Sequence, residues 1–190
     1  MFEPALEAAH LIDRLERLAR SGELGEGLNP AQWDALRYLA RANRFSRTPA
    51  ALSDYLASTR GTVSQTLIAL EGKGYVSREP SRRDKRSIDL TLTRQGERAL
   101  KRDPLLVLAQ DIAQAAGPRA KMFSECLRQT LRHALARNRG RAFDLCAGCR
   151  HFRADAHPAP GSPHHCALLD QPLSQADSQA ICVEQEPAAA

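Results

Sequence analysis

Residues 59–93 read TRGTVSQTLIALEGKGYVSREPSRRDKRSIDLTLT. Up to residue 72 the apolar side chains recur at helical spacing, which predicts a helix over 59–72. Residues 75–78 and 88–93 alternate between apolar and polar side chains, which predicts two strands joined as a hairpin. The inward face of the helix is expected to consist of Val63, Leu67 and Leu70.

The turn of this hairpin concentrates positive charge. Its sequence, SRRDKRS at 81–87, holds four cations and one carboxylate. A basic tip beside a polar-faced helix suits a DNA duplex, because the tip can contact phosphates while the helix enters the major groove. The candidate DNA-binding residues are Arg60, Thr62, Ser64, Gln65, Arg82, Arg83, Lys85 and Arg86.

The side chains of the helix have the chemistry needed to read bases. Arg60 can bind guanine with two hydrogen bonds, Gln65 can bind adenine, and Ser64 suits a base or a phosphate. At the tip, Arg83 and Arg86 are expected in or beside the minor groove, where negative potential is concentrated. A solvated basic hairpin is the alternative for SRRDKRS taken alone; the preceding helix favours DNA.

Two motifs in this region resemble the winged helix-turn-helix of the MarR family of bacterial regulators. Residues 70–76, LEGKGYV, are similar to the family's join between recognition helix and wing, with Gly72 replacing the more usual residue. The wing signature D-x-R-D-x-R has Ser81 at its first position but keeps Arg83, Asp84 and Arg86. The resemblance implies a DNA-binding regulator and covers roughly residues 1–140.

Amphipathic helices are predicted on both sides of this region. A stripe of leucine and isoleucine runs through residues 3–21, and Phe123, Leu127, Leu131 and Leu135 form another at i, i+4 spacing. Packing within one subunit is one interpretation of these stripes. In proteins of the MarR family the first and last helices pair across a two-fold axis. We therefore favour a homodimer that binds a pseudo-palindromic operator, one half-site per subunit.

Composition supports a mainly α-helical DNA-binding domain with a distinct appendage. The chain has 190 residues, of which 43% are hydrophobic and only 5% aromatic. Its net charge of +5 divides into +8 over residues 1–140 and −3 over residues 141–190. No apolar run is long enough to span a membrane, and the N-terminal stretch lacks the pattern of a secretory signal. We expect a cytoplasmic protein with no membrane partner.

Residues 141–190 hold four of the five cysteines, spaced Cys146-x2-Cys149-x16-Cys166-x15-Cys182. Four soft thiolates suit zinc or an iron–sulfur cluster. Disulfides and four buried, unliganded cysteines are the alternatives. A reducing cytoplasm argues against disulfides, and so polar a segment offers little core for unliganded cysteines. The sequence predicts a metal site formed by Cys146, Cys149, Cys166 and Cys182.

The spacing favours a 4Fe-4S cluster over zinc. Structural zinc usually shows two CxxC pairs, and this chain has one. One pair followed by two single cysteines is similar to the spacing in high-potential iron–sulfur proteins. Nearby histidines, including His151, His164 and His165, are alternative ligands or neighbours of the site. The apolar shell is expected from Leu145, Phe152, Leu168, Leu169, Leu173 and Ile181.

The sequence thus predicts a mainly α-helical winged helix-turn-helix with a small β-hairpin wing, flanking dimerisation helices and an irregular four-cysteine tail. Its expected function is sequence-specific transcriptional regulation, with repression favoured, and sensing of redox state or iron through the tail. The alternatives are an electron-transfer or cluster-carrier protein, and a regulator with purely structural zinc. We expect no enzyme, because no Ser-His-Asp, phosphate-loop or paired-carboxylate pattern stands out.

Overall fold

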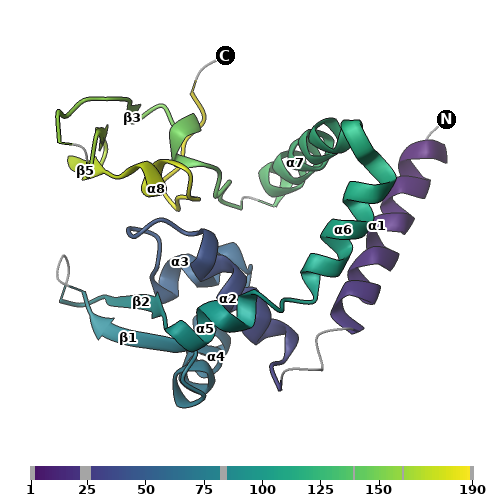
Figure 1. The fold of residues 1–190 in the computed structure, drawn as a ribbon, viewed down its shortest axis with the longest axis horizontal. Helices are drawn as coiled ribbons and strands as arrows, with labels where there is room; N and C mark the ends of the chain where they lie inside the picture. Colours follow the sequence, from purple (N-terminus) through teal and green to yellow (C-terminus); the bar gives the residue numbers. More distant parts are fainter. Residues whose placement is uncertain (1–2, 22–26, 82–84, 139, 160, 189–190) are drawn as a thin grey trace.

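The computed structural model describes residues 3–21, 27–81, 85–138, 140–159 and 161–188. The described residues form three parts: a central winged helix, an arm of long helices on one side, and a small tail above the winged helix (Figure 1). None of the described helices is both long and apolar enough to cross a bilayer.

The central part confirms the predicted order of a helical unit followed by a hairpin. The strands pair antiparallel in the register Val76↔Leu92 to Pro80↔Ile88. Its elements are α2 (Pro30–Arg41), α3 (Pro49–Tyr55), α4 (Arg60–Gly72), β1 (Val76–Pro80), β2 (Ile88–Leu92) and α5 (Arg94–Leu100).

Local capping signals set the helix starts. Asn29 caps α2 in a capping box with Gln32, and Pro30 occupies the first turn. Thr48 caps α3, again followed by proline, and Thr93 caps α5. The sequence alone indicates these three helix starts, because each capping residue bonds to a residue within about four positions of it.

The hairpin and α5 approach each other closely at one glycine. A Cβ on Gly96 would lie 2.3 Å from the carbonyl oxygen of Tyr75, so only glycine fits this position of α5. The chain leaves α4 through Gly74, whose φ of +78° lies in the left-handed region. These two glycines fix how the helices meet the wing.

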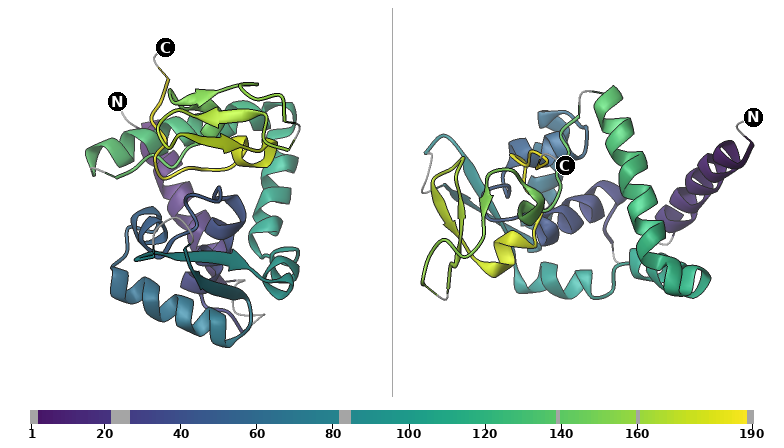
Figure 2. Two further views of the ribbon diagram at one scale, coloured as in Figure 1. Left: turned by 90° about the vertical axis from the view of Figure 1, so that its left-hand side faces the viewer. Right: turned by 90° about the horizontal axis from the view of Figure 1, so that it is seen from above.

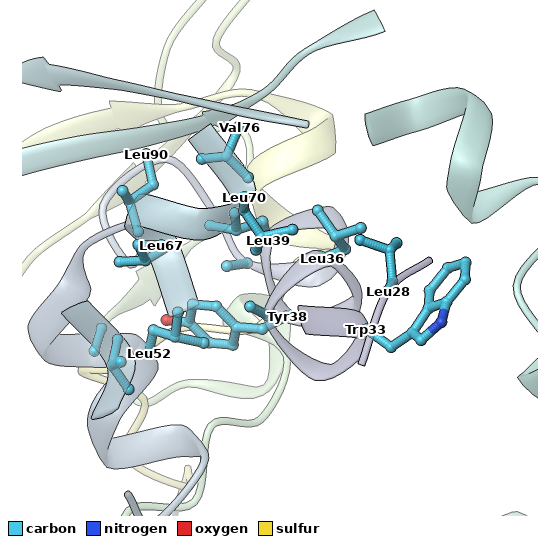
Figure 3. Packing of buried hydrophobic residues seen from close by; sticks show 14 of the residues in the cluster. Leu28, Trp33, Leu36, Tyr38, Leu39, Leu52, Leu67, Leu70, Val76 and Leu90 are labelled. Carbon is cyan, nitrogen blue, oxygen red and sulfur yellow. The ribbon is translucent and has the colours of Figure 1, made fainter. Parts of the chain in front are cut away.

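The main core lies between α2, α3, α4 and the hairpin. Tyr38 of α2 points toward Leu52 of α3, and Leu67 of α4 lies near Leu90 of β2 (Figure 3). The buried face of α4 is the predicted one: Val63, Leu67 and Leu70. Two residues of the tail, Phe143 and Ile181, belong to the same core. The tail therefore shares a core with the winged helix.

The arm consists of three long helices and has little core of its own. None of these helices contains a buried residue. Its elements are α1 (Glu3–Ser21), α6 (Leu105–Ala116), the short 3-10 turn η2 (Gly117–Arg119) and α7 (Ala120–Arg137). Seen from above, α1 and α7 extend away from the winged helix (Figure 2). Asp103 and Pro104 separate α5 from α6.

The tail is more regular than its composition suggests. It contains a three-stranded antiparallel sheet in the order β3-β4-β5, and His157 N donates to Pro163 O (2.9 Å) within the connection between β3 and β4. Its elements are the 3-10 turn η3 (Cys146–Gly148), β3 (Phe152–Arg153), β4 (His164–Cys166), β5 (Gln171–Leu173) and α8 (Gln175–Ser178). The tail and α4 lie on opposite sides of the winged helix (Figures 1 and 2).

Candidate nucleic-acid interface and cysteine site

Helix α4 presents a polar face to solvent. The Oγ1 of Thr59 accepts the N–H of Thr62 (3.2 Å), which fixes the first turn. Because Val63, Leu67 and Leu70 face the core, the opposite side is left for polar residues. Arg60, Thr62 and Gln65 are exposed there and Ser64 is half-buried.

The hairpin lies beside α4. Lys85 and Arg86 are exposed at its tip, whereas the predicted contacts Arg82 and Arg83 lie outside the described residues. Arg78 of β1 pairs with Glu71 of α4 at 3.5 Å, which links the hairpin to the helix. The structure thus places four candidate residues on α4 and two at the tip of one hairpin.

The tail is attached to the winged helix mainly at the loop between α2 and α3. Ile181 forms a short parallel bridge there: its N donates to Arg41 O (2.8 Å), and its O accepts Asn43 N (2.9 Å). Phe143 packs edge-on against Tyr38 and Tyr55, with ring centroids 6.0 and 5.2 Å away. Backbone pairing and aromatic packing together hold the tail on this loop.

A second attachment joins the tail to the arm. Arg128 and Arg132 of α7 both pair with Asp144, which lies two residues before Cys146. Burial opposes the ionisation of Asp144. The hydrogen bonds from Arg132 and from the N–H of Leu145 outweigh that effect and lower the pKa of Asp144. The residues beside the cysteines therefore contact both the arm and the winged helix.

The four tail cysteines lie near one another, and Cys146, Cys166 and Cys182 share one buried cluster. Cys149 is half-buried, and all four are free thiols in this structure. Burial, reinforced by the neighbouring thiols of the other three, raises the pKa of Cys146 to about 12. Around the cysteines lie Phe45 and Leu173, with Phe152 and Leu169 packed against them.

The CxxC pair folds as the tight turn η3. Cys149 N donates to Cys146 O (3.0 Å), and Cys146 N donates to Ala180 O (3.0 Å), which pairs the turn with the segment before Cys182. The N–H of Glu186 donates to Cys149 Sγ at 3.5 Å. Within the described ranges no group of three or more His, Cys, Asp and Glu side chains is placed to hold a single metal ion.

The winged-helix region matches a known family model. Residues 26–87 match the model of the MarR family. This part of the chain is therefore similar to the winged helix of the MarR family. The match includes α2, α3, α4 and the hairpin up to its tip, and it leaves the helical arm and the cysteine tail outside. No curated protein matches the chain.

Solved structures share the fold of the winged helix and its arm. A MarR transcriptional regulator from Methanosarcina mazei is 22% identical, with a TM-score of 0.56 over 70% of this chain and 98% of that one. A mutant MarR from E. coli is 23% identical, with a TM-score of 0.52 over 66% and 94%. MepR from S. aureus in a DNA complex is 18% identical, with a TM-score of 0.53 over 68% and 96%.

Several expectations about the tail need revision. His164, considered as an alternative ligand, uses both ring nitrogens within the tail: Nε2 lies 2.8 Å from Gln175 Oε1, and Nδ1 accepts Asp155 N (3.2 Å). Leu168 is exposed, not part of the apolar shell. Leu145 and Ile181 pack with the main core instead. Only Phe152, Leu169 and Leu173 of the expected shell lie at the cysteines.

The sequence analysis did not anticipate the contribution of the winged helix to this site. Phe45, Asn43 and Ser46, from the loop between α2 and α3, lie beside the cysteines. The one local signal was an aromatic residue, Phe45, just before the Thr48-Pro49 helix start, since an aromatic side chain in a loop usually needs a packing partner. Nothing near residue 45 in the sequence indicates that this partner lies more than 100 residues away.

Proposed function

We propose that this chain is a homodimeric, DNA-binding transcriptional regulator, and not an enzyme. The observation that carries the proposal is the outward polar face of α4 beside an exposed basic hairpin tip, within a MarR-family winged helix. Arg60 and Gln65 have the donors and acceptors needed to read guanine and adenine edges. Lys85 and Arg86 supply charge for the phosphates that flank the groove. The likeness in fold to MepR, which was solved in a DNA complex, supports DNA binding by this chain.

The homodimer is supported by the apolar faces of the arm. Leu6, Leu11 and Leu18 of α1 are 58%, 50% and 60% exposed, and Leu131 of α7 is 55% exposed. Apolar stripes of this extent are costly in water and mark association surfaces. A second copy of the chain would cover them and would present two α4 helices to successive turns of one duplex.

The DNA-binding proposal can be tested by selection from a library of randomised duplexes. The wild-type chain is expected to enrich pseudo-palindromic sites whose half-sites lie about one helical turn apart. The matched control is the double variant Arg60→Ala/Gln65→Ala, which leaves the buried face of α4 intact. If the wild-type protein enriches no sequence beyond this control, the proposed use of α4 is wrong.

We further propose that the four tail cysteines hold a cofactor, a 4Fe-4S cluster in the first instance and zinc as the alternative. The chemistry of the donors suits such a group: there are four soft thiols, of which Cys146, Cys166 and Cys182 share one buried cluster with Phe45 and Leu173, and an N–H is directed at Cys149 Sγ. On binding such a cofactor the four cysteines would lose their protons, and the resulting thiolates would be cross-linked through it. Its gain or loss would make DNA binding respond to iron or to redox state.

Anaerobic purification with absorption spectra and with iron, sulfide and zinc analysis tests this second proposal. Cys146→Ser, Cys149→Ser, Cys166→Ser and Cys182→Ser are each expected to lose the metal, because a missing thiolate opens the site. Cys126→Ser is the control, since Cys126 is exposed on α7 away from the cluster. Iron and sulfide in the wild type support the cluster, and one zinc per chain with DNA binding insensitive to oxidant supports structural zinc. A coloured protein that ignores DNA supports an electron carrier.

A further inference from the structure

One buried polar group beside the cysteines has no hydrogen-bond partner. Asn43, in the loop after α2, is 2% exposed, and its Nδ2 forms no hydrogen bond. Buried polar groups in folded proteins are nearly always hydrogen-bonded, so such an atom calls for an explanation.

The orientation of this amide is fixed by its oxygen. Asn43 Oδ1 accepts the N–H of Phe45 (3.1 Å), the N–H of Ser46 (3.0 Å) and the hydroxyl of Ser46 (2.8 Å). The two backbone N–H groups can only donate, so the atom that faces them must be the oxygen. The NH₂ group of Asn43 therefore faces away from the backbone N–H groups of Phe45 and Ser46.

Cys182 lies beside this loop. The residues before and after it are both hydrogen-bonded to the loop: Ile181 O accepts Asn43 N (2.9 Å), and Val183 N donates to Ser46 Oγ (2.9 Å). Burial is the largest influence on Cys182 and raises the pKa of its thiol. The Asn43 amide is close enough to oppose this effect, as are the N–H of Glu184 and the hydroxyl of Ser46.

A protonated thiol is a weak acceptor, whereas a metal-bound thiolate keeps negative charge and accepts hydrogen bonds well. We infer that Asn43 is the hydrogen-bond donor to a metal-bound Cys182 thiolate, so that the winged helix itself completes the cysteine site. This inference rests on the proposed cofactor site. It assigns Asn43 the role of a positioning residue, which orients a ligand without touching the metal.

Asn43 lies on a loop that is also bonded to the wing. Four residues further along, Arg47 O accepts the N–H of Leu90 of the wing (2.8 Å), and Thr48 caps α3. The loop that donates to Cys182 is therefore bonded to β2 and leads directly into α3. Metal bound at the cysteines would hold this loop through the hydrogen bond from Asn43 to Cys182. Loss of the metal would weaken that bond and so loosen the loop.

Cadmium-113 bound to the full-length wild-type chain provides a direct test. Cadmium is a soft ion that takes the same thiolate donors as zinc. With ¹⁵N-labelled asparagine, the side-chain amide protons of Asn43 are expected to move downfield on addition of one equivalent and to show scalar coupling to ¹¹³Cd across the N–H···S bond. Asn29 and Asn138, which lie away from the cysteines, are internal references. An Asn43 amide that neither shifts nor couples while cadmium is bound would overturn the inference.

Substitution provides a second, independent test. Asn43→Asp keeps the oxygen that Phe45 and Ser46 require but replaces the NH₂ donor, so zinc affinity measured by chelator competition should fall at least about tenfold. The matched control is Ser53→Ala in α3, which removes the partly buried hydrogen bond from Ser53 Oγ to Ser58 O without touching the tail. Ser53→Ala should lower the melting temperature and leave zinc affinity unchanged. Equal affinity for wild type and Asn43→Asp would overturn the inference. A wild type that binds neither metal would instead remove the cofactor site on which it rests.

Discussion

Arg37 of α2 and Asp103 form a two-point ion pair, with Nη2 2.6 Å from Oδ1 and Nε 2.9 Å from Oδ2. Asp103 is only 8% exposed, and its Oδ1 also accepts the N–H of Leu105 at the start of α6 (2.8 Å). One carboxylate thus joins the winged helix to the first turn of the arm. The pair sets the direction in which the arm leaves the winged helix.

Asp103→Ala is expected to destabilise the fold by about 3 kcal/mol, because it leaves the charge of Arg37 without its main partner in a poorly solvated position. Urea unfolding followed by the fluorescence of Trp33, the single tryptophan, measures this loss. The control is Asp13→Ala, which breaks the exposed pair with Arg17 on α1 and should cost less than about 1 kcal/mol. Equal losses in the two variants would contradict the linking role of Asp103.

The recognition residues of α4 are expected to determine sequence preference. Arg60→Ala and Gln65→Ala should each weaken binding to the selected operator by about 1–3 kcal/mol and relax the preference at one symmetric pair of bases. A panel of single-base-pair changes in the operator measures both effects. Glu97→Gln, at an exposed position of α5, is the control. Full discrimination in both alanine variants would mean that another surface reads the bases.

The hairpin tip is expected to add affinity without sequence preference. Replacing Lys85 and Arg86 with alanine removes two cations that can neutralise phosphates in each subunit, so binding to operator and random DNA should fall together. The slope of log affinity against log salt should become shallower by about one for each phosphate that is no longer neutralised. Arg14→Ala on α1 controls for net charge. A double variant with the wild-type salt slope would show that the tip does not touch DNA.

The arm is expected to hold the dimer. Leu131→Asp and Ile12→Asp each place a charge in an apolar stripe that a second copy would bury, and an unpaired buried charge is strongly disfavoured. Analytical ultracentrifugation should show a dimeric wild type and monomeric or aggregated variants. Gln129→Glu, on the polar side of α7, should remain dimeric. A well-folded wild-type monomer at micromolar concentration that still binds DNA tightly would contradict the two-fold model.

The tail thiols are expected to make the stability of the metal-free protein depend on pH. The pKa of Cys146 is raised from 9.0 to about 12 in the folded chain, so its contribution is complete below pH 9 and is lost as the pH rises toward 12. The melting temperature of the metal-free protein should therefore fall above pH 9. Cys146→Ser should flatten this dependence, and bound metal should remove it because the thiolates are already ionised. A metal-free wild type with the same pH profile as Cys146→Ser would contradict this assignment.

The sequence by itself determined the winged helix, because its signals are local. Asn29-Pro30 and Thr48-Pro49 mark helix starts within a few residues, and the alternation on either side of SRRDKRS specifies the hairpin. The outward face of α4 followed from the spacing of Val63, Leu67 and Leu70. The cysteine spacing likewise predicted that the tail cysteines belong together, and three of them, Cys146, Cys166 and Cys182, share one buried cluster.

Only the tertiary structure decided what the tail rests on. Asn43 and Ile181 are 138 residues apart, and their pairing depends on backbone groups that every residue carries, so no residue pattern predicts it. The same holds for Phe45, whose burial beside the cysteines requires the whole tail to fold back over the loop after α2. Local periodicity specifies which face of an element is apolar. The partner that covers that face is chosen by the packing of the entire chain.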